Sequence, residues 1–406
     1  MRAEADEDTG VAVVGGGLVG CSLALALARR GQRPVLIEAT PEGPVAPPSF
    51  DERNLALARA SLDALAMLGV LEGLDRPPEP ITQIHVSRAG DLGSVRLDAA
   101  EHGVAAFGGV VMARDLGKAL SRAVSAEAAI SRRSGTAVTA IEPVAQGWRL
   151  HLATTNGDRS SLRCRLLVAA DGSDSRLRGW LGIDEEVHDY GQHLVVCSIE
   201  AAGARRGQAW ERFSATGPVA LLPRNDGRWG AVCGVATAEA GAVMALDDAA
   251  YAEYLQSRFG WRAGRLSRPG RRVAYPLRLR VARRVHAERA VLVGNAAQTL
   301  HPVGAQGFNL GLRDALGLAE AVAGAEDPGV PQRLAAYLRS REEDRRRTLA
   351  FSDGLARLTA SENVAARALR SLGLLALGVS RRARAPLVHA AMGLTGMPEA
   401  WRGEAS

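Results

Sequence analysis

The first forty residues alternate between short apolar runs and turn residues in a regular order. Residues 11–14 (VAVV) have the pattern of a buried strand, and a glycine turn, Gly15–Gly17, follows directly. The apolar residues of Leu18–Arg29 suit a buried helix, and Gly31 stands where a glycine commonly ends a helix. Residues 34–38 (PVLIE) then form a second apolar run. This order predicts a strand–helix–strand unit of the dinucleotide-binding kind.

Further along the chain the pattern changes to shorter, alternating runs. Residues 147–167 alternate around a Gly157-Asp158 turn and predict a hairpin that leads into a short strand at 166–169. Several strand-like runs within 186–285 are separated by turn signals, which predicts a mainly antiparallel sheet. Residues 290–293 predict another buried strand, and the chain from about 332 onward has a helical pattern. The proline-rich stretch 41–49 is expected to be a loop.

The composition excludes several classes of protein. The 406 residues are 47% hydrophobic and 23% charged, which is typical of a soluble globular protein with more than one domain. The four cysteines form no CxxC pair, and the eight histidines show no metal-ligand spacing, so we expect a reduced cytoplasmic protein without a metal site. The net charge is +6, but only 4% of residues are aromatic, which argues against nucleic-acid binding.

We expect neither a signal peptide nor a membrane span in the N-terminal region. Residues 2–9 are acidic, unlike the basic start of a secretory signal. Residues 10–28 are uncharged and long enough to imitate a membrane helix, but Gly15–Gly17 interrupts them. We therefore expect a strand, a turn and a helix there.

The glycine turn has the spacing of a nucleotide-binding fingerprint. Gly15 permits a tight turn, Gly17 allows a pyrophosphate to approach the backbone, and Gly20 allows the helix to pack against the strand. Glu38, at the end of the second strand, can accept hydrogen bonds from ribose hydroxyls. This motif alone does not distinguish FAD from NAD, and a glycine turn without a ligand is the alternative.

Two later motifs add specificity. Asp171-Gly172 follows the short strand at 166–169, and residues 292–311 read LVGNAAQTLHPVGAQGFNLG. Together with the glycine turn, the chain resembles the FAD-dependent aromatic-ring hydroxylases of the para-hydroxybenzoate hydroxylase fold, and within them the ubiquinone-biosynthesis branch. The shared stretches run over nearly the whole chain and include FDERNLAL at 50–57, ERFSATGPVALLP at 211–223, FGWRAG at 259–264 and AYPL at 274–277.

The resemblance implies roles for particular residues. Asp171 and Gly172 would lie near the FAD pyrophosphate and ribose, Arg114 would reach the phosphates or ribose, and Arg53 would sit beside the flavin. For each arginine the alternative is an ordinary surface ion pair. Asn295 replaces the usual aspartate, and its amide oxygen can still accept a hydrogen bond from a ribityl hydroxyl.

The segment from Pro302 to Asn309 is the candidate flavin-adjacent loop. Gly304 and Gly307 would let the backbone pass close to a planar ring, and the helix that starts near Phe308 would direct its positive end at the reduced flavin. The ubiquinone branch usually has Ala-Gly-Gln-Gly where this chain has Gly304-Ala305-Gln306-Gly307. No catalytic base can be named from the sequence. His301 is a candidate, but a packing residue before a proline explains it as well.

The resemblance implies a fold class and an activity. We expect an α/β protein whose FAD-binding Rossmann-like domain, a βαβ unit with a parallel sheet, is interleaved with a mainly antiparallel substrate domain and followed by a helical C-terminal region. The expected FAD-binding segments are 1–80, 105–185 and 285–331, the substrate segments are 81–104 and 186–284, and the helical region is 332–406. The expected activity is hydroxylation of a polyprenylated methoxyphenol in ubiquinone biosynthesis with FAD, NAD(P)H and O2.

Several alternatives stay open at this stage. The same fold could hydroxylate a soluble aromatic or polyketide, reduce isoprenoid double bonds, or serve as a non-catalytic flavin-binding scaffold. Residues 371–380 (SLGLLALGVS), followed by Arg381, Arg382 and Arg384, could form an interfacial helix that contacts anionic lipid or other quinone-pathway enzymes. A tail helix packed on the core with a solvated basic end is the competing interpretation, and ten apolar positions cannot span a bilayer.

Overall fold

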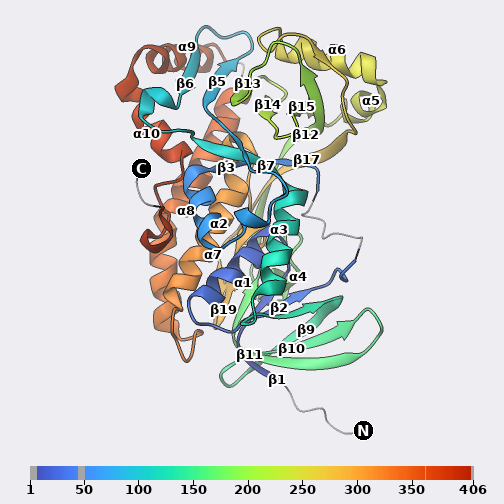
Figure 1. The fold of residues 1–406 in the computed structure, drawn as a ribbon, viewed down its shortest axis with the longest axis vertical. Helices are drawn as coiled ribbons and strands as arrows, with labels where there is room; N and C mark the ends of the chain where they lie inside the picture. The colour runs from blue at the N-terminus through green and yellow to red at the C-terminus, as the bar shows by residue number, and fades with distance from the viewer. Residues whose placement is uncertain (1–6, 44–50, 362, 404–406) are drawn as a thin grey trace.

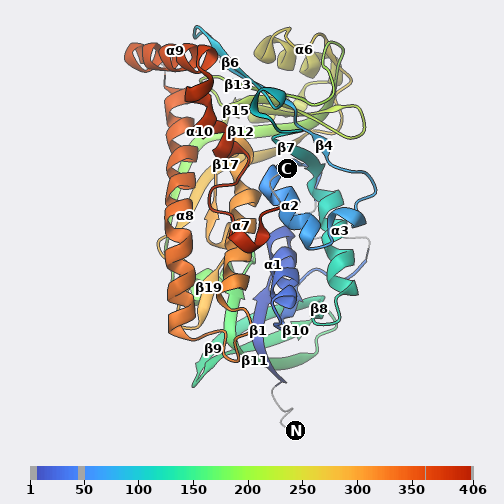
Figure 2. The same cartoon turned by 60° about the vertical axis from the view of Figure 1, so that its left-hand side comes forward.

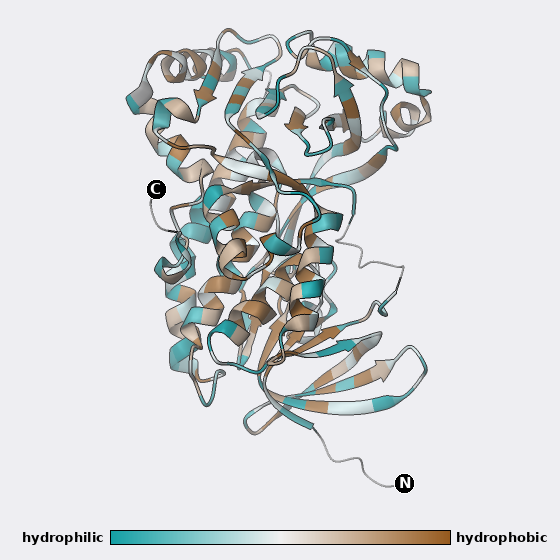
Figure 3. Cartoon of the chain, in the orientation of Figure 1, coloured by the Kyte–Doolittle hydropathy of each residue, from teal (hydrophilic) through white to brown (hydrophobic). Residues whose placement is uncertain are grey.

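The computed structural model describes residues 7–43, 51–361 and 363–403 and has two sheet regions joined along one long helix (Figure 1). The predicted loop 41–49 and the shared stretch 50–57 therefore lie partly outside the described residues. Figure 2 shows α8 (Pro331–Ala360) running beside both regions. The apolar residues follow the strands and the inner faces of the helices in Figure 3, as a core requires.

The first sheet contains the predicted strand–helix–strand unit. Its strand order is β18-β19-β11-β1-β2-β8, with β9 and β10 extending β11 as a meander. β1 pairs in parallel with both β11 and β2, so the glycine turn after β1 lies at the centre of the sheet. The strands are β1 (Glu7–Val14), β2 (Val35–Glu38), β8 (Ser131–Ser134), β9 (Thr136–Val144), β10 (Gly147–Thr154), β11 (Arg159–Ala169), β18 (His286–Ala287) and β19 (Ala290–Leu292).

Helices cover the first sheet, and their apolar faces are buried against its strands. α1, α3 and α7 pack over it with buried residues such as Leu23, Leu120 and Leu316. A small sheet of β3 (Asn54–Ala58), β4 (Glu79–Pro80) and β7 (Gly108–Met112) lies between this layer and the second sheet (Figure 1). The helices of this part are α1 (Leu18–Arg29), α2 (Arg59–Met67), α3 (Ala113–Ala126), α4 (Arg176–Trp180) and α7 (Gln306–Ala321).

The second sheet is mainly antiparallel, as the sequence predicts. Its order is β20-β17-β12-β15-β14-β13-β5-β6, and β16 pairs with β12. Among the described strand pairs of this second sheet, only β13–β5 is parallel. α5 (Ala240–Ala245) and α6 (Asp248–Phe259) cover one face, where Tyr251 and Phe259 are fully buried. The strands are β5 (Gln83–Arg88), β6 (Ser94–Asp98), β12 (Glu185–Ala201), β13 (Gln208–Phe213), β14 (Val219–Pro223), β15 (Trp229–Ala236), β16 (Leu266–Ser267), β17 (Val273–Ala282) and β20 (Gln298–Thr299).

The C-terminal region is helical, as predicted. α8 is followed by α9 (Val364–Val379) and α10 (Arg381–Ala391), which lie beside β6 and the end of α8. Within the described ranges, no helix is both long and apolar enough to cross a membrane.

The sequence interpretation missed some details of strand organisation. The predicted short strand at 166–169 is the end of the much longer β11, and β9 makes the predicted hairpin a three-stranded meander. β20 falls in the expected FAD-binding segment 285–331 but pairs with β17 of the second sheet. The domain boundaries themselves stay a prediction.

Candidate active site

A cavity of about 1080 Å³ lies between the two sheets and the C-terminal helices. One end is bounded by the glycine turn after β1, and the middle by the loop before α7. The other end reaches the inner face of the second sheet and the helices α8 and α9. Of the predicted site residues, those that line this cavity are Gly15, Gly17, Glu38, Arg53, Asp171, Gly172, Asn295, Pro302, Gly304, Gly307 and Asn309.

The glycine turn has the geometry that a bound pyrophosphate requires. Gly15 has φ +108°, and a Cβ there would lie 2.3 Å from the carbonyl oxygen of Ala170. A Cβ at Gly20 would lie 1.9 Å from the Gly15 oxygen, so Gly20 permits close packing and does not itself line the cavity. No side chain caps the N-terminus of α1, which leaves its first N–H groups available to an anion.

Glu38 is held rigidly at the end of β2. Its carboxylate accepts hydrogen bonds from the backbone N–H of Gly16 and of Thr40, both at 2.7 Å. A carboxylate has about four acceptor sites, so two remain for ribose hydroxyls.

The second motif forms a short, well-connected turn. Asp171 accepts hydrogen bonds from the Ser175 hydroxyl at 2.5 Å and from the Leu177 N–H at 3.2 Å. Asn295 donates to the Ser173 hydroxyl at 3.3 Å, so its amide oxygen can face a ligand. A Cβ at Gly172 would meet no atom within 4 Å, which leaves space for a ligand beside the backbone.

The loop before α7 has an unusual backbone. Gly304 has φ +67°, and Ala305 has φ +52°, so both residues are left-handed. Ala305 therefore carries a side chain where glycine is favoured, at a cost of about 1–2 kcal/mol, and the Ala-Gly order would place a side chain at the equally left-handed position 304. A Cβ at Gly307 would meet no atom within 4 Å, so the start of α7 borders open space. This N-terminus also lacks a side-chain cap.

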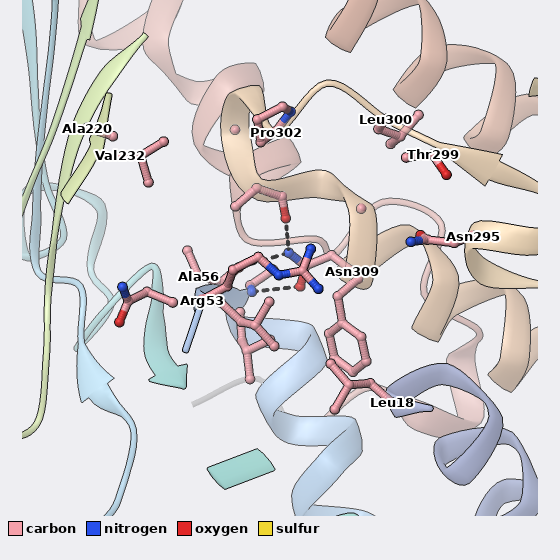
Figure 4. Close-up of a pocket in the computed structure, with 18 of the residues that line it drawn as sticks. Leu18, Arg53, Ala56, Ala220, Val232, Asn295, Thr299, Leu300, Pro302 and Asn309 are labelled. Carbon is pink, nitrogen blue, oxygen red and sulfur yellow. Dashed lines mark hydrogen bonds between the residues drawn. The ribbon is translucent and has the colours of Figure 1, made fainter. Parts of the chain in front are cut away.

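Asn309 fixes this loop in place. Its Nδ2 donates to the carbonyl oxygens of Ala56 at 3.0 Å and Ala305 at 2.8 Å, and its Oδ1 accepts from the Ala58 N–H at 3.0 Å. Figure 4 shows Asn309 at the centre of this network, beneath Pro302. Its amide is engaged with the backbone, so the structure supports a positioning role for Asn309, while its contact with FAD stays a prediction.

The two arginines differ. Arg53 lines the cavity, pairs with Asp51 at 2.7 Å and lies over the ring of Tyr275, 5.3 Å from its centroid. Arg114 does not line the cavity, and its guanidinium pairs with Glu52 and with Asp115. The ion-pair alternative thus describes the present surroundings of Arg114.

His301 is buried outside the cavity lining. Its ring packs edge-on against Tyr190, 4.9 Å between centroids, and burial lowers its pKa to about 4. A histidine with this pKa is neutral at physiological pH, and the position agrees with the packing interpretation.

Glu211 is the functional candidate that the sequence interpretation missed. It stands on β13 within the shared stretch 211–223 and lines the cavity. Burial raises the pKa of its carboxyl to about 7, while hydrogen bonding from the Gly304 backbone opposes that rise. The sequence offered one signal for this site: Glu211 is a carboxylate at a strand position that alternates with the apolar residues Ala209 and Phe213.

Comparison with known proteins agrees with this geometry. A family described as "FAD binding domain" matches residues 8–352. Ubiquinone hydroxylase UbiL of Rhodospirillum rubrum is 33% identical over 378 residues, which cover 92% of this chain and 87% of that protein. The chain belongs to the FAD-dependent ubiquinone hydroxylase family. It is therefore a flavin-dependent monooxygenase.

Other members and solved structures extend the comparison. The 3-demethoxyubiquinol 3-hydroxylase of Escherichia coli is 29% identical over 326 residues. These residues cover 80% of this chain and 82% of the Escherichia coli protein. The structure of p-nitrophenol 4-monooxygenase PnpA from Pseudomonas putida aligns with a TM-score of 0.79 at 20% identity, over 97% of this chain and 100% of that one. That likeness confirms the predicted fold class.

Proposed function

We propose that this ubiquinone hydroxylase family member hydroxylates a polyprenylated methoxyphenol, the substrate class of 2-octaprenyl-6-methoxyphenol hydroxylase, with FAD, NAD(P)H and O2. The observation that carries the proposal is the continuity of the cavity. It joins an anion-accepting glycine turn, an exposed backbone loop and a long apolar region in a single space. A substrate with a small polar head and a long apolar tail fits a cavity whose lining changes from polar to apolar in this order.

The cofactor end has the donors and the space that FAD requires. We propose that the pyrophosphate binds at the N-terminus of α1 and that Glu38 holds the adenosine ribose. Asp171, Gly172 and Asn295 would bind the ribityl and phosphate groups. The isoalloxazine ring would contact Arg53, Pro302, Gly304 and Gly307. Arg114 would bind the cofactor only if it left its present ion pairs with Glu52 and Asp115.

The protein itself would position the cofactor and the substrate, supply an electrostatic field at the flavin and exclude water. When bound, FAD supplies the electrons and activated oxygen of the reaction. The uncapped N-terminus of α7 would stabilise negative charge on the reduced ring. Exclusion of water by the apolar walls would protect the activated oxygen from wasteful decay. NAD(P)H would visit transiently, since the sequence has one glycine-rich fingerprint.

The substrate end has an apolar wall that suits a polyprenyl tail. The inner face of the second sheet supplies Ile84, Val86, Leu97, Phe213, Ala220, Leu222 and Val232, and Figure 4 shows Ala220 and Val232 across the open space from Pro302. The relatives' names, a ubiquinone hydroxylase and a demethoxyubiquinol hydroxylase, support a substrate of this chemistry.

We further propose that α9 makes a peripheral membrane contact through which such a substrate enters. Leu374 and Leu377 line the cavity from the inner side of α9. On its outer side, Leu372 is 66% exposed and Val379 is 85% exposed, and the basic residue Arg382 follows at the start of α10. A helix that is apolar on both sides suits a position between a greasy cavity and a lipid surface.

Oxygen uptake with a defined phenol tests the main proposal. The protein, reconstituted with FAD, is given NADPH and 2-geranyl-6-methoxyphenol, with the O-methyl ether of that phenol as a matched control. We expect flavin absorption bands, NADPH-dependent oxygen uptake stimulated by the phenol only, and a product heavier by one oxygen. NADPH consumption without an oxygenated product would refute the substrate class and favour another aromatic substrate. Failure to bind FAD would refute the whole proposal.

Flotation with liposomes tests the membrane contact. We expect wild-type protein to float with vesicles containing anionic lipid, and a Leu372→Ser/Val379→Ser double variant to float several-fold less. A Val187→Ser variant is the matched control, since Val187 is also exposed (54%) but lies on β12, where it pairs with Arg280 of β17. Equal flotation of all three proteins would contradict the contact.

A further inference from the structure

The inner face of β13 carries a carboxyl group among apolar residues. Side chains of a strand alternate between its two faces, and Ala209, Glu211 and Phe213 all line the cavity. The residues beside Glu211 on the neighbouring strands are Val86 of β5 and Ala220 of β14, which also line it. Glu211 is therefore set into the apolar wall that would face a substrate ring.

Within the described part of the chain, no cation neutralises this carboxyl group. Among the residues that the structure describes, Glu211 forms no ion pair, and no charged side chain contributes to the shift of its pKa. The other charged groups of the cavity have partners of their own. Arg53 pairs with Asp51, Arg88 and Arg370 pair with Asp91, Arg176 lies over Trp180, and Glu38 and Asp171 accept hydrogen bonds from their own turns. An unneutralised carboxyl in an apolar wall is costly, which points to a function.

The position of Glu211 links the two ends of the cavity. The backbone of Gly304, in the loop proposed to lie against the flavin, interacts with the Glu211 carboxyl through a hydrogen bond. A substrate ring held between the second sheet and that loop would thus present a polar group to Glu211 close to the reacting face of the cofactor. With a pKa of about 7, the carboxyl can both take and return a proton near neutral pH.

We propose that Glu211 is the catalytic base that accepts the proton of the substrate's phenolic hydroxyl during hydroxylation. This assignment rests on the proposed function, because it requires a phenol in the cavity. The phenolic O–H bond breaks, the proton moves to the Glu211 carboxylate, and the electron pair flows through the ring to a carbon. That carbon bonds to one oxygen atom of the activated O2 as the O–O bond breaks.

The proton is returned when the ring becomes aromatic again. The C–H bond at the hydroxylated carbon breaks and its proton goes to water, while the phenolic oxygen regains a proton from Glu211. The second oxygen atom of O2 leaves as water, reduced by the two electrons that NAD(P)H supplies. Glu211 ends the cycle as a carboxylate.

Ligand binding without turnover tests the contact. FAD-loaded oxidised protein, without NAD(P)H, is titrated from pH 5.5 to 8.5 with 2-geranyl-6-methoxyphenol and with its O-methyl ether. A phenol donates a hydrogen bond to the carboxylate, so its binding should strengthen as Glu211 ionises. The ether has no donor and buries the charge, so its binding should weaken. We expect the ratio of the ether Kd to the phenol Kd to rise about tenfold from pH 6 to pH 8.

Two substitutions make the result specific. Glu211→Gln should give a ratio that does not change with pH, because its amide does not titrate. Glu200→Gln, on β12 of the same sheet and outside the cavity lining, should behave like wild type. In turnover, Glu211→Gln should lower kcat by about 100-fold or more, with the Kd of the ether at pH 6 unchanged.

The outcomes separate the two proposals. An equal pH dependence of phenol and ether in wild type would overturn the base assignment and leave the proposed function intact. The expected pH linkage without any oxygenated product would overturn the proposed function and support a phenol contact at Glu211. If neither compound binds, both proposals are wrong.

Discussion

Replacement of Glu211 by glutamine should stabilise the protein, but only above the pH at which the unfolded carboxyl ionises. The shape of Glu211 is kept and its charge is removed. In the folded protein burial raises the pKa of this carboxyl from 4.5 to about 7. Folding therefore holds a proton that the unfolded chain releases, and stability falls as the pH rises from 4.5 towards 7. Above 7 the folded protein bears the full cost of the buried carboxylate.

The size of the effect follows from the gap between these two pKa values. Each pH unit of that gap corresponds to about 1.4 kcal/mol, so the gap sets an upper limit of about 3.5 kcal/mol at pH 8. Glu211 borders the cavity and keeps some accessible surface, so water there reduces the cost. We expect Glu211→Gln to be more stable than wild type by about 1–3 kcal/mol at pH 8 and by less than about 1 kcal/mol at pH 5.

Thermal unfolding at a fixed FAD concentration is the assay. The midpoint of Glu211→Gln should exceed that of wild type by a few degrees at pH 8, and the two should nearly coincide at pH 5. Glu200→Gln is the control, since Glu200 lies in a partly exposed ion pair with Arg228. A difference between Glu211→Gln and wild type that stays constant from pH 5 to pH 8 would refute the claim that Glu211 is buried without a counter-ion.

Four further variants test the loop, the turn and the core. Ala305→Gly should stabilise the protein by about 0.5–1 kcal/mol by relieving a left-handed alanine, and a lower thermal midpoint would contradict this backbone geometry. Asn309→Ala should cost about 1–3 kcal/mol and weaken FAD retention, because the buried Ala58 N–H loses its acceptor; unchanged retention would remove the positioning role. Gly20→Ala should yield protein without flavin absorbance, since its Cβ would lie 1.9 Å from the Gly15 oxygen. Asp314→Ala should cost about 1–3 kcal/mol in urea unfolding, because the buried Gln298 amide loses its acceptor and Arg341 loses one partner at 2.9 Å while Asp344 still neutralises it; a loss below about 0.5 kcal/mol would show the pair to be dispensable.

The cofactor half of the molecule could be predicted from local signals. The turn at Gly15–Gly20, the helix at 18–29 and the acid at Glu38 are close in sequence, and the φ of +108° at Gly15 is a local property that glycine satisfies. The mainly antiparallel second sheet was predicted for the same reason, since alternation is visible within each strand. β9 was missed because its alternation is weak, and β20 because two residues form no readable pattern.

The tertiary structure decided which partners surround the predicted residues. Asn309 was placed among the cofactor contacts by its motif, yet its amide binds Ala56, Ala58 and Ala305, which lie beside it only after folding. Arg114 reads as a phosphate ligand in sequence, but the neighbouring carboxylates of Glu52 and Asp115 hold it.

Glu211 shows most clearly which properties of the site follow from the sequence and which follow only from the tertiary structure. The sequence determined the family and the cofactor, because the glycine turn, Asp171-Gly172 and residues 292–311 occur together in the order that the resemblance requires. It could not reveal that one carboxyl of β13 faces Gly304, ninety-three positions later, across an apolar cavity. Burial and the absence of a counter-ion among the described residues are properties of packing between distant segments, and these properties raise the pKa to about 7.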